Sequence, residues 1–137
     1  MSTRSRRRTE LLRWLPVLAW MALIFILSSI SGLRASDNAE VERPLRVLAH
    51  LTSYAVLAAL LLYALAGLKR PRIIDVTIAY GLTVVYGMTD EFHQSFVPNR
   101  TGRLDDLMVD AIGAAIGLTL GYVALRILAR AVAARER

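Results

Sequence analysis

Apolar residues occupy four long stretches of the chain, and polar residues gather in the short segments between them. The hydrocarbon core of a bilayer is crossed by about 20 mostly apolar helical residues. A strand alone in lipid leaves its backbone groups unpaired, so each stretch is expected to be a helix. The pattern predicts an all-α membrane protein, a bundle of four transmembrane helices over residues 14–31, 47–68, 73–96 and 107–129.

Composition agrees with this class. Of the 137 residues, 55% are hydrophobic and the mean hydropathy is +0.46, which is too apolar for an ordinary soluble domain of this size. We therefore expect a single integral membrane domain over residues 1–137. The chain has no cysteine, which excludes disulfides, thiolate metal sites and cysteine nucleophiles. The net charge of +6 comes from residues that flank apolar stretches, so we expect no nucleic-acid partner.

The distribution of basic residues predicts an orientation. Twelve of the 17 lysines and arginines fall in the N-terminal segment, the turn Lys69–Arg72 and the C-terminal tail. The other five fall in the remaining two connections. Positively charged flanks favour the cytoplasm. Both termini are therefore expected in the cytoplasm, with the loops Gly32–Arg46 and Asp90–Asp106 facing outward.

An alternative for the first stretch is a secretory signal peptide, because the arginines of "RSRRR" precede it. The apolar part of a signal peptide usually has 7–15 residues and ends in a small-x-small site. The stretch Trp14–Ser31 is longer and continues into "SGLRASD". We therefore expect a transmembrane helix here.

The predicted topology brings ionisable residues from three helices to one depth. His50 and Tyr54 are four residues apart, near the outer end of the second helix. The third helix ends outward in a polar segment, and the fourth begins with aspartates. The candidate pocket comprises Asp90, Glu91, Gln94, Arg100, Asp106, His50, Tyr54 and Asp110.

At these residues the chain resembles the VanZ-like family of small bacterial membrane proteins, from about Arg46 to Gly121. The blocks that carry the resemblance are "AHLTSYAVL", "DEFHQSFVPNR" and "DLMVDAIGAAIG". Members of the family are associated with low-level resistance to the glycopeptide teicoplanin without remodelling of the peptidoglycan stem peptide. The resemblance therefore implies a multi-pass protein of the bacterial inner (cytoplasmic) membrane with a role in the cell envelope. Most members have no assigned reaction.

Two positions depart from the family pattern. The chain has Asp110 where asparagine is frequent. It has Val47 where lysine is frequent, with Arg46 one residue further back. Both differences change the charge next to the candidate pocket.

Two interpretations of the polar cluster remain open. In the first, the carboxylates form an ion-paired cap with Arg100 and Arg103, and Asp105 or Asp106 is the N-cap of the fourth helix. In the second, they form an outward-facing pocket for a membrane lipid or a lipid-linked envelope intermediate, because intramembrane charges are often functional.

The second interpretation assigns roles to individual side chains. Arg100 would hold a phosphate or carboxylate, and Asp90 or Glu91 would act as a general base. His50 would transfer a proton and Tyr54 would donate a hydrogen bond. An enzyme that transfers or hydrolyses a phosphate- or acyl-linked group is thus an alternative to a binding protein. The sequence offers no activated nucleophile, which favours binding, and the catalytic residues stay unknown.

Metal binding is a separate possibility. The candidate ligands are His50, His93, Glu91 and Asp106, which suit zinc or manganese. Their spacing matches no compact metal motif, and "DEFHQ" is not H-E-x-x-H. We therefore predict no metal and no cofactor from the sequence.

Three glycines follow at four-residue spacing in the fourth helix. The positions Gly113, Gly117 and Gly121 form a double small-xxx-small pattern, which permits close approach of another helix. We expect these glycines to serve packing. The partner is either a helix of the same chain or a second copy, which makes a homo-oligomer possible.

Overall fold

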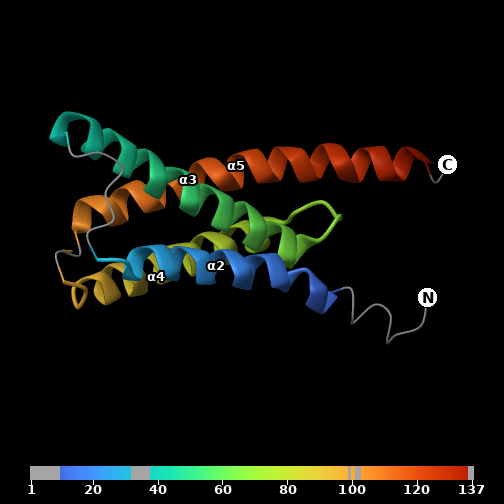
Figure 1. The fold of residues 1–137 in the computed structure, drawn as a ribbon. Coiled ribbons are helices and arrows are strands. Elements are labelled where there is room, and N and C mark those ends of the chain that lie inside the picture. Colours follow the sequence, from blue (N-terminus) through green and yellow to red (C-terminus); the bar gives the residue numbers. More distant parts are fainter. Residues whose placement is uncertain (1–9, 32–37, 99, 101–102, 136–137) are drawn as a thin grey trace.

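The protein is an antiparallel arrangement of helices. The computed structural model describes residues 10–31, 38–98, 100 and 103–135, and all regular structure in these ranges is helical. The labelled helices are α2 (Trp14–Ser29), α3 (Ala39–Ala66), α4 (Ile73–Gln94) and α5 (Leu104–Arg135) (Figure 1). The all-helical prediction is thus confirmed for the described part of the chain.

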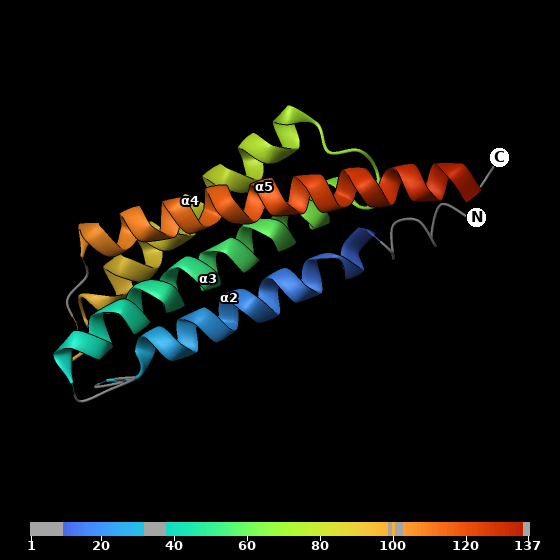
Figure 2. The ribbon, with the colours of Figure 1, turned by 90° about the horizontal axis from the view of Figure 1, so that it is seen from above.

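Successive helices run in opposite directions. Figures 1 and 2 both place the start of α2, the α3–α4 connection and the end of α5 at one end of the molecule. The end of α2, the start of α3, the end of α4 and the start of α5 lie at the other, which we call the polar end.

Three of the described helices are long and apolar enough to cross a membrane, and they cover Glu10–Ser29, Glu40–Ala66 and Leu104–Arg135. The helix α4 is not among them, and its last two turns carry Asp90, Glu91 and His93. Large apolar side chains are exposed along the outer faces of the helices, as Leu18 on α2 and Leu120 on α5 illustrate. Such surfaces suit contact with lipid, and together with the apolar helices they identify a membrane protein.

One helix boundary differs from the sequence-based expectation. Residues 39–46 were expected in the outward loop Gly32–Arg46, yet they form the first two turns of α3. The side chain of Asn38 caps this helix by accepting a hydrogen bond from the Glu40 N–H at 2.9 Å. Glu40 and Glu42 follow in the first turn, where carboxylates suit the helix dipole. An apolar stretch cannot reveal this extension because four of the eight added residues are charged.

The start of α5 also corrects an expectation. The helix begins at Leu104, so Asp105 and Asp106 lie in its first turn, and neither is an N-cap. Both carboxylates still lie near the positive end of the helix dipole. The other observed helix ends differ from the predicted spans by a few residues.

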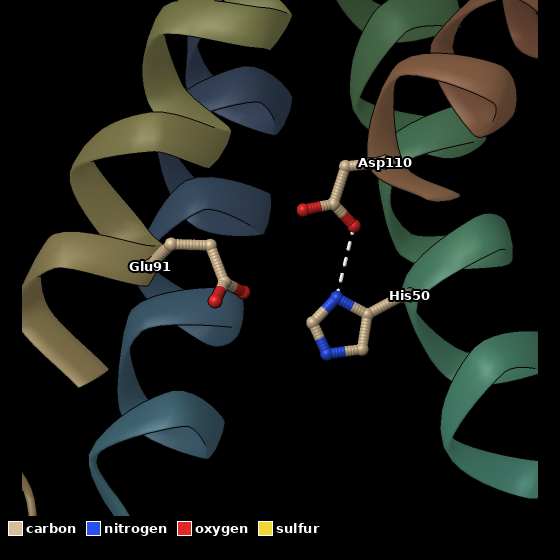
Figure 3. A group of neighbouring side chains, drawn as sticks. All are labelled: His50, Glu91 and Asp110. Carbon is tan, nitrogen blue, oxygen red and sulfur yellow. Dashed lines mark hydrogen bonds and ion pairs between the residues drawn. The ribbon is translucent and has the colours of Figure 1, made fainter. Parts of the chain in front are cut away.

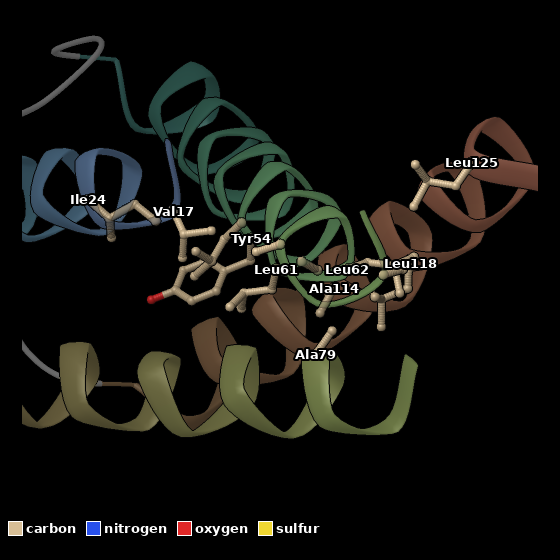
Figure 4. Packing of buried hydrophobic residues seen from close by; sticks show 13 residues of the cluster. Val17, Ile24, Tyr54, Leu61, Leu62, Ala79, Ala114, Leu118 and Leu125 are labelled. Carbon is tan, nitrogen blue, oxygen red and sulfur yellow. The ribbon is translucent and has the colours of Figure 1, made fainter. Parts of the chain in front are cut away.

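The helix α3 is the centre of the packing, because it contacts each of the other three helices. Its inward face is apolar and spaced by three and four residues, as expected for a buried helical stripe. The buried residues of this face are Tyr54, Leu57, Ala58, Leu61 and Leu62. Figure 4 shows this face meeting Val17 of α2, Ala79 of α4 and Ala114 of α5.

Among the side-chain hydrogen bonds that fasten α2 to its neighbours, two have an aromatic donor. The indole N–H of Trp20 donates to the carbonyl oxygen of Ser53 in α3 at 2.9 Å. The hydroxyl of Tyr86 in α4 donates to the carbonyl oxygen of Met21 at 2.6 Å. Both bonds satisfy polar groups that would otherwise be unpaired in an apolar surrounding.

The glycines of α5 form its contact with α3. A Cβ atom on Gly113 would overlap the carbonyl oxygen of Leu51, and one on Gly117 would overlap that of Ala55. At Gly121 the same atom would make ordinary contact with Ala59. The packing role is therefore filled within the chain. A homo-oligomer through these glycines stays a prediction, and a second copy would compete with α3 for this face.

A matched pair of substitutions tests the close crossing. We expect Gly117→Ala to lower stability by about 1–3 kcal/mol, because the new methyl group forces α5 away from α3. Gly81→Ala makes the same chemical change where nothing lies within 4 Å. It should be neutral or stabilising by up to about 1 kcal/mol through helix propensity. Melting followed by circular dichroism in detergent measures both, and equal melting temperatures would contradict the crossing.

Candidate functional site

The polar end contains a buried cluster of acidic and amide side chains within an otherwise apolar bundle. Five of the expected pocket residues are at least nine-tenths buried here, namely Asp90, Glu91, Gln94, Asp106 and Asp110. His50 and Tyr54 of α3 join them, and we call these seven residues the polar cluster. The sequence-based expectation that three helices bring ionisable residues together thus matches the geometry, and their role as a pocket stays a prediction.

Asp90 is held by neutral hydrogen-bond donors. Its carboxylate accepts bonds from the Ser28 hydroxyl at 2.6 Å and from the Gln94 amide at 2.9 Å. The Tyr54 hydroxyl is 3.5 Å away, at the limit of a hydrogen bond. Gln94 reaches Asp90 because residues four apart share one helix face. The contribution of Ser28 was not predicted, although it sits in a polar pair, "SS", at the end of an apolar stretch.

Glu91 connects the end of α4 to the start of α5. One of its oxygens accepts a hydrogen bond from the backbone N–H of Arg103 at 2.7 Å, just before α5 begins. The other is 3.4 Å from the Gln94 amide nitrogen. A backbone donor of this kind stabilises a carboxylate without a countercharge and fixes its orientation.

His50 and Asp110 form a close pair between α3 and α5. The His50 Nδ1 and the Asp110 Oδ1 are 2.9 Å apart (Figure 3). The second oxygen of Asp110, Oδ2, is buried and has no hydrogen-bond partner among the described residues. Figure 3 shows that the Glu91 side chain points toward this pair from α4. One ligand atom from each of the three residues lies within 4.8 Å of the others.

Arg100 occupies a different place from the one expected for a counterion. Its guanidinium donates to the carbonyl oxygens of Leu27 at 3.2 Å and Ile30 at 3.3 Å, which belong to the C-terminal end of α2. It also lies 3.4 Å from the Gln94 side-chain oxygen. The last carbonyl groups of a helix lack intrahelical partners, so Arg100 caps α2 from the connection that precedes α5.

The ion pair with a buried carboxylate comes from Arg46 instead. Its guanidinium is 3.5 Å from Asp106. Arg103, the other expected counterion, pairs through its side chain with the exposed Asp105 at 3.3 Å. Sequence reasoning missed Arg46 because it was assigned to a loop. The available signal was its position four residues before His50, which places both on one face of a helix.

His93 faces α2 and lies apart from the three-residue group of His50, Glu91 and Asp110. Its ring stacks on Phe25 with the centroids 4.4 Å apart, and its Nε2 is 3.0 Å from the Ser29 hydroxyl. It therefore takes part in packing at the polar end. Asp106, which was also considered as a metal ligand, is engaged by Arg46.

A cavity of about 500 Å³ lies at the opposite end of the molecule, among the start of α2, the end of α3 and the start of α4. Its charged lining residues are Glu10, Arg13, Lys69, Arg70, Arg72 and Asp75. Asp75 accepts a hydrogen bond from the Arg72 backbone N–H at 2.8 Å, which satisfies a donor at the N-terminal end of α4. The cavity lining thus includes four cationic and two acidic side chains.

Comparison with known proteins gives one match for the chain. The family model described as VanZ/LLP1 matches residues 12–126, which include the whole polar cluster. No curated protein and no solved structure gave a match.

The ion pair at the polar end leads to a double-mutant prediction. Arg46→Gln should destabilise the protein by about 1–3 kcal/mol, because it leaves the buried Asp106 carboxylate without its cation. The double variant Arg46→Gln, Asp106→Asn should lose less stability than the sum of the losses of the two single variants. The exposed Arg43, substituted by Gln, is the matched control and should be neutral. Additive melting-temperature changes would contradict the coupling.

Proposed function

The chain belongs to the VanZ/LLP1 family, and on this premise we propose that it binds a lipid-linked or other cell-envelope component through an outward-facing polar site. The protein would be a multi-pass protein of the bacterial cytoplasmic membrane. The observation that carries the proposal is the polar cluster, in which four buried carboxylates meet inside an apolar bundle. Buried charges in a membrane are costly, so their presence favours a functional role over a structural one.

The proposed topology has four crossings, with both termini in the cytoplasm. The helix α4 would cross the membrane in addition to the three apolar helices, since it runs from the end that holds the cavity to the polar end (Figure 1). Support for the orientation comes from Arg13, Lys69, Arg70 and Arg72, which gather at the end where α2 begins and α5 ends. Basic residues favour the cytoplasmic side. The polar end would then face outward.

Arginines at the rim of the polar cluster suit an anionic ligand. The side chains of Arg46 and Arg103 are 37% and 45% exposed, although each contacts an aspartate. Arg100 is half-buried beside Gln94. A phosphate or carboxylate that approaches from outside would meet these planar guanidinium groups first. Sequestration of such an envelope intermediate is how the protein would contribute to teicoplanin resistance.

A membrane enzyme is the second candidate, and the His50–Asp110 pair favours it. A histidine oriented by a carboxylate is a common arrangement for general acid–base catalysis. The enzyme would transfer or hydrolyse a phosphate- or acyl-linked group at the outer leaflet. Loss of turnover with retention of ligand in Asp90→Asn would distinguish this candidate from a pure binding protein.

Single cysteines can test the topology directly, because the native chain has none. Ser95→Cys lies at the polar end and Lys69→Cys at the opposite end, and both positions are exposed. In intact spheroplasts, a membrane-impermeant maleimide should label the first variant. It should label the second only after lysis. The reverse pattern would place the polar cluster on the cytoplasmic side and contradict the proposed orientation.

Lipid analysis tests the binding proposal. We expect mass spectrometry to find an anionic lipid or lipid-linked species with the purified wild-type protein, and at least about tenfold less with Arg100→Ala, because one charge-assisted contact is lost. The exposed Arg130→Ala, at the other end of α5, is the matched control and should retain the lipid.

Resistance provides the parallel measurement in cells. Expression of the wild-type chain should raise the minimum inhibitory concentration of teicoplanin, and Asp90→Asn should abolish the increase. If folded Arg100→Ala and Asp90→Asn both keep wild-type lipid occupancy and resistance, the polar cluster is a structural cap and the proposed function is wrong.

A further inference from the structure

We propose that His50, Glu91 and Asp110 together bind one divalent metal ion, of the zinc or manganese class. The inference deepens the proposed function, on which its biological role rests, by assigning a cofactor to the same site. Three independent observations carry it: the distances among the ligand atoms, an unpaired buried oxygen and an excess of negative charge.

The first observation is geometric. The three residues belong to α3, α4 and α5, and one ligand atom of each lies within 4.8 Å of the others. Ligands bound to zinc at about 2.0–2.2 Å are separated from one another by about 3–3.5 Å. The His50 Nδ1 and the Asp110 Oδ1 are 2.9 Å apart, slightly closer than this spacing, so they would move apart by a few tenths of an ångström around a bound ion. The Glu91 carboxylate, whose ligand atom is at most 4.8 Å from the other two, would move closer to them to complete the set.

The second observation is the unpaired oxygen of Asp110. This residue is only 1% exposed, yet its Oδ2 has no hydrogen-bond donor in the described part of the chain. Leaving a buried carboxylate oxygen unsatisfied is costly, and native structures seldom do so without a reason. Figure 3 shows that the Asp110 oxygen that does not face His50 lies on the side of Glu91, where a shared cation would bind.

The third observation is charge. Among the described residues, four buried carboxylates of the polar cluster face one guanidinium, that of Arg46, within ion-pairing distance. A divalent ion among His50, Glu91 and Asp110 would offset this excess of acidic groups. The ion would also attract both carboxylates nearest to it.

The surroundings of Glu91 and the ligand types suit such an ion. The Arg103 backbone N–H orients the Glu91 carboxylate as an outer-shell partner, a common feature of metal sites. One imidazole and two carboxylates fit zinc or manganese better than the softer, thiolate-seeking metals. Three protein ligands leave a coordination position for water or for a phosphate oxygen of the ligand, as in catalytic zinc centres.

The test measures metal binding by the full-length protein in detergent. After removal of metal with a chelator, the protein is titrated with ZnCl₂ and separately with MnCl₂ by calorimetry. Metal content is determined by inductively coupled plasma mass spectrometry. We expect one ion per chain for the wild type, and affinity lower by at least about tenfold in His50→Gln, Glu91→Gln and Asp110→Asn.

Two matched variants are the controls. His93→Gln removes a histidine at the polar end that stacks on Phe25, and Asp105→Asn removes an exposed carboxylate of α5. Both should bind like the wild type. Equal losses in these controls and in the three ligand variants, or no stoichiometric binding by the wild type, would overturn the proposal in favour of a proton-sharing His50–Asp110 pair.

A second measurement needs no variant and covers the case in which a ligand variant fails to fold. Co²⁺ added to the metal-free wild-type protein should produce the visible absorption of a low-coordinate site, and Zn²⁺ should displace it. The melting temperature should rise with metal concentration, because an ion that binds only the folded state stabilises it. A featureless spectrum together with an unchanged melting temperature contradicts the site.

The outcomes separate this inference from the proposed function. A protein without metal that still retains its lipid in an Arg100-dependent manner would refute the metal site alone. A protein with one bound metal and no co-purified lipid would keep the metal site and refute the binding proposal.

Discussion

The close contact between α5 and α3 is the constraint on which the polar cluster depends. Gly113 and Gly117 bring the backbone of α5 against carbonyl groups of α3, where no other residue type leaves room. Asp110 precedes the first of these glycines by three residues, so its carboxylate reaches His50 without a long side chain. Any residue that widened this crossing would separate the two side chains and open the apolar core beside them.

A second condition is that the buried carboxylates obtain their donors mainly from neutral groups. Asp90 relies on a hydroxyl and an amide, and Glu91 relies on a backbone N–H. Arg46 supplies the ion pair to Asp106 from the solvent side of the cluster. Neutral donors satisfy hydrogen-bond acceptors but leave the negative charge in place, and the low dielectric of a bundle core strengthens the field of that charge. The same arrangement that stabilises the individual side chains therefore makes the cluster attractive to a cation.

The connection between α4 and α5 serves both the fold and the site. Arg100 caps the end of α2, while the Arg103 backbone holds Glu91 at the end of α4. A short segment thus fastens three helix ends around the polar cluster. For the proposed envelope ligand, Arg100 and Arg103 of this segment would form the outer rim of the site and would contact a bound anion.

Hydrophobic patterning was sufficient to predict an all-helical membrane protein, and helical spacing was sufficient to place His50 and Tyr54 on one face of a helix. Both properties are local, because they follow from the length of an apolar stretch and from 3.6 residues per turn. These local properties could not predict the partners of Arg46 and Arg100. Each long side chain has several possible targets, and only the packing of α2, α3 and α5 selects one. Likewise, the sequence shows that His50, Glu91 and Asp110 are present, but it does not show that these three side chains form one group. The tertiary structure decides that, because the distance between the helices depends on how closely the glycines let them approach.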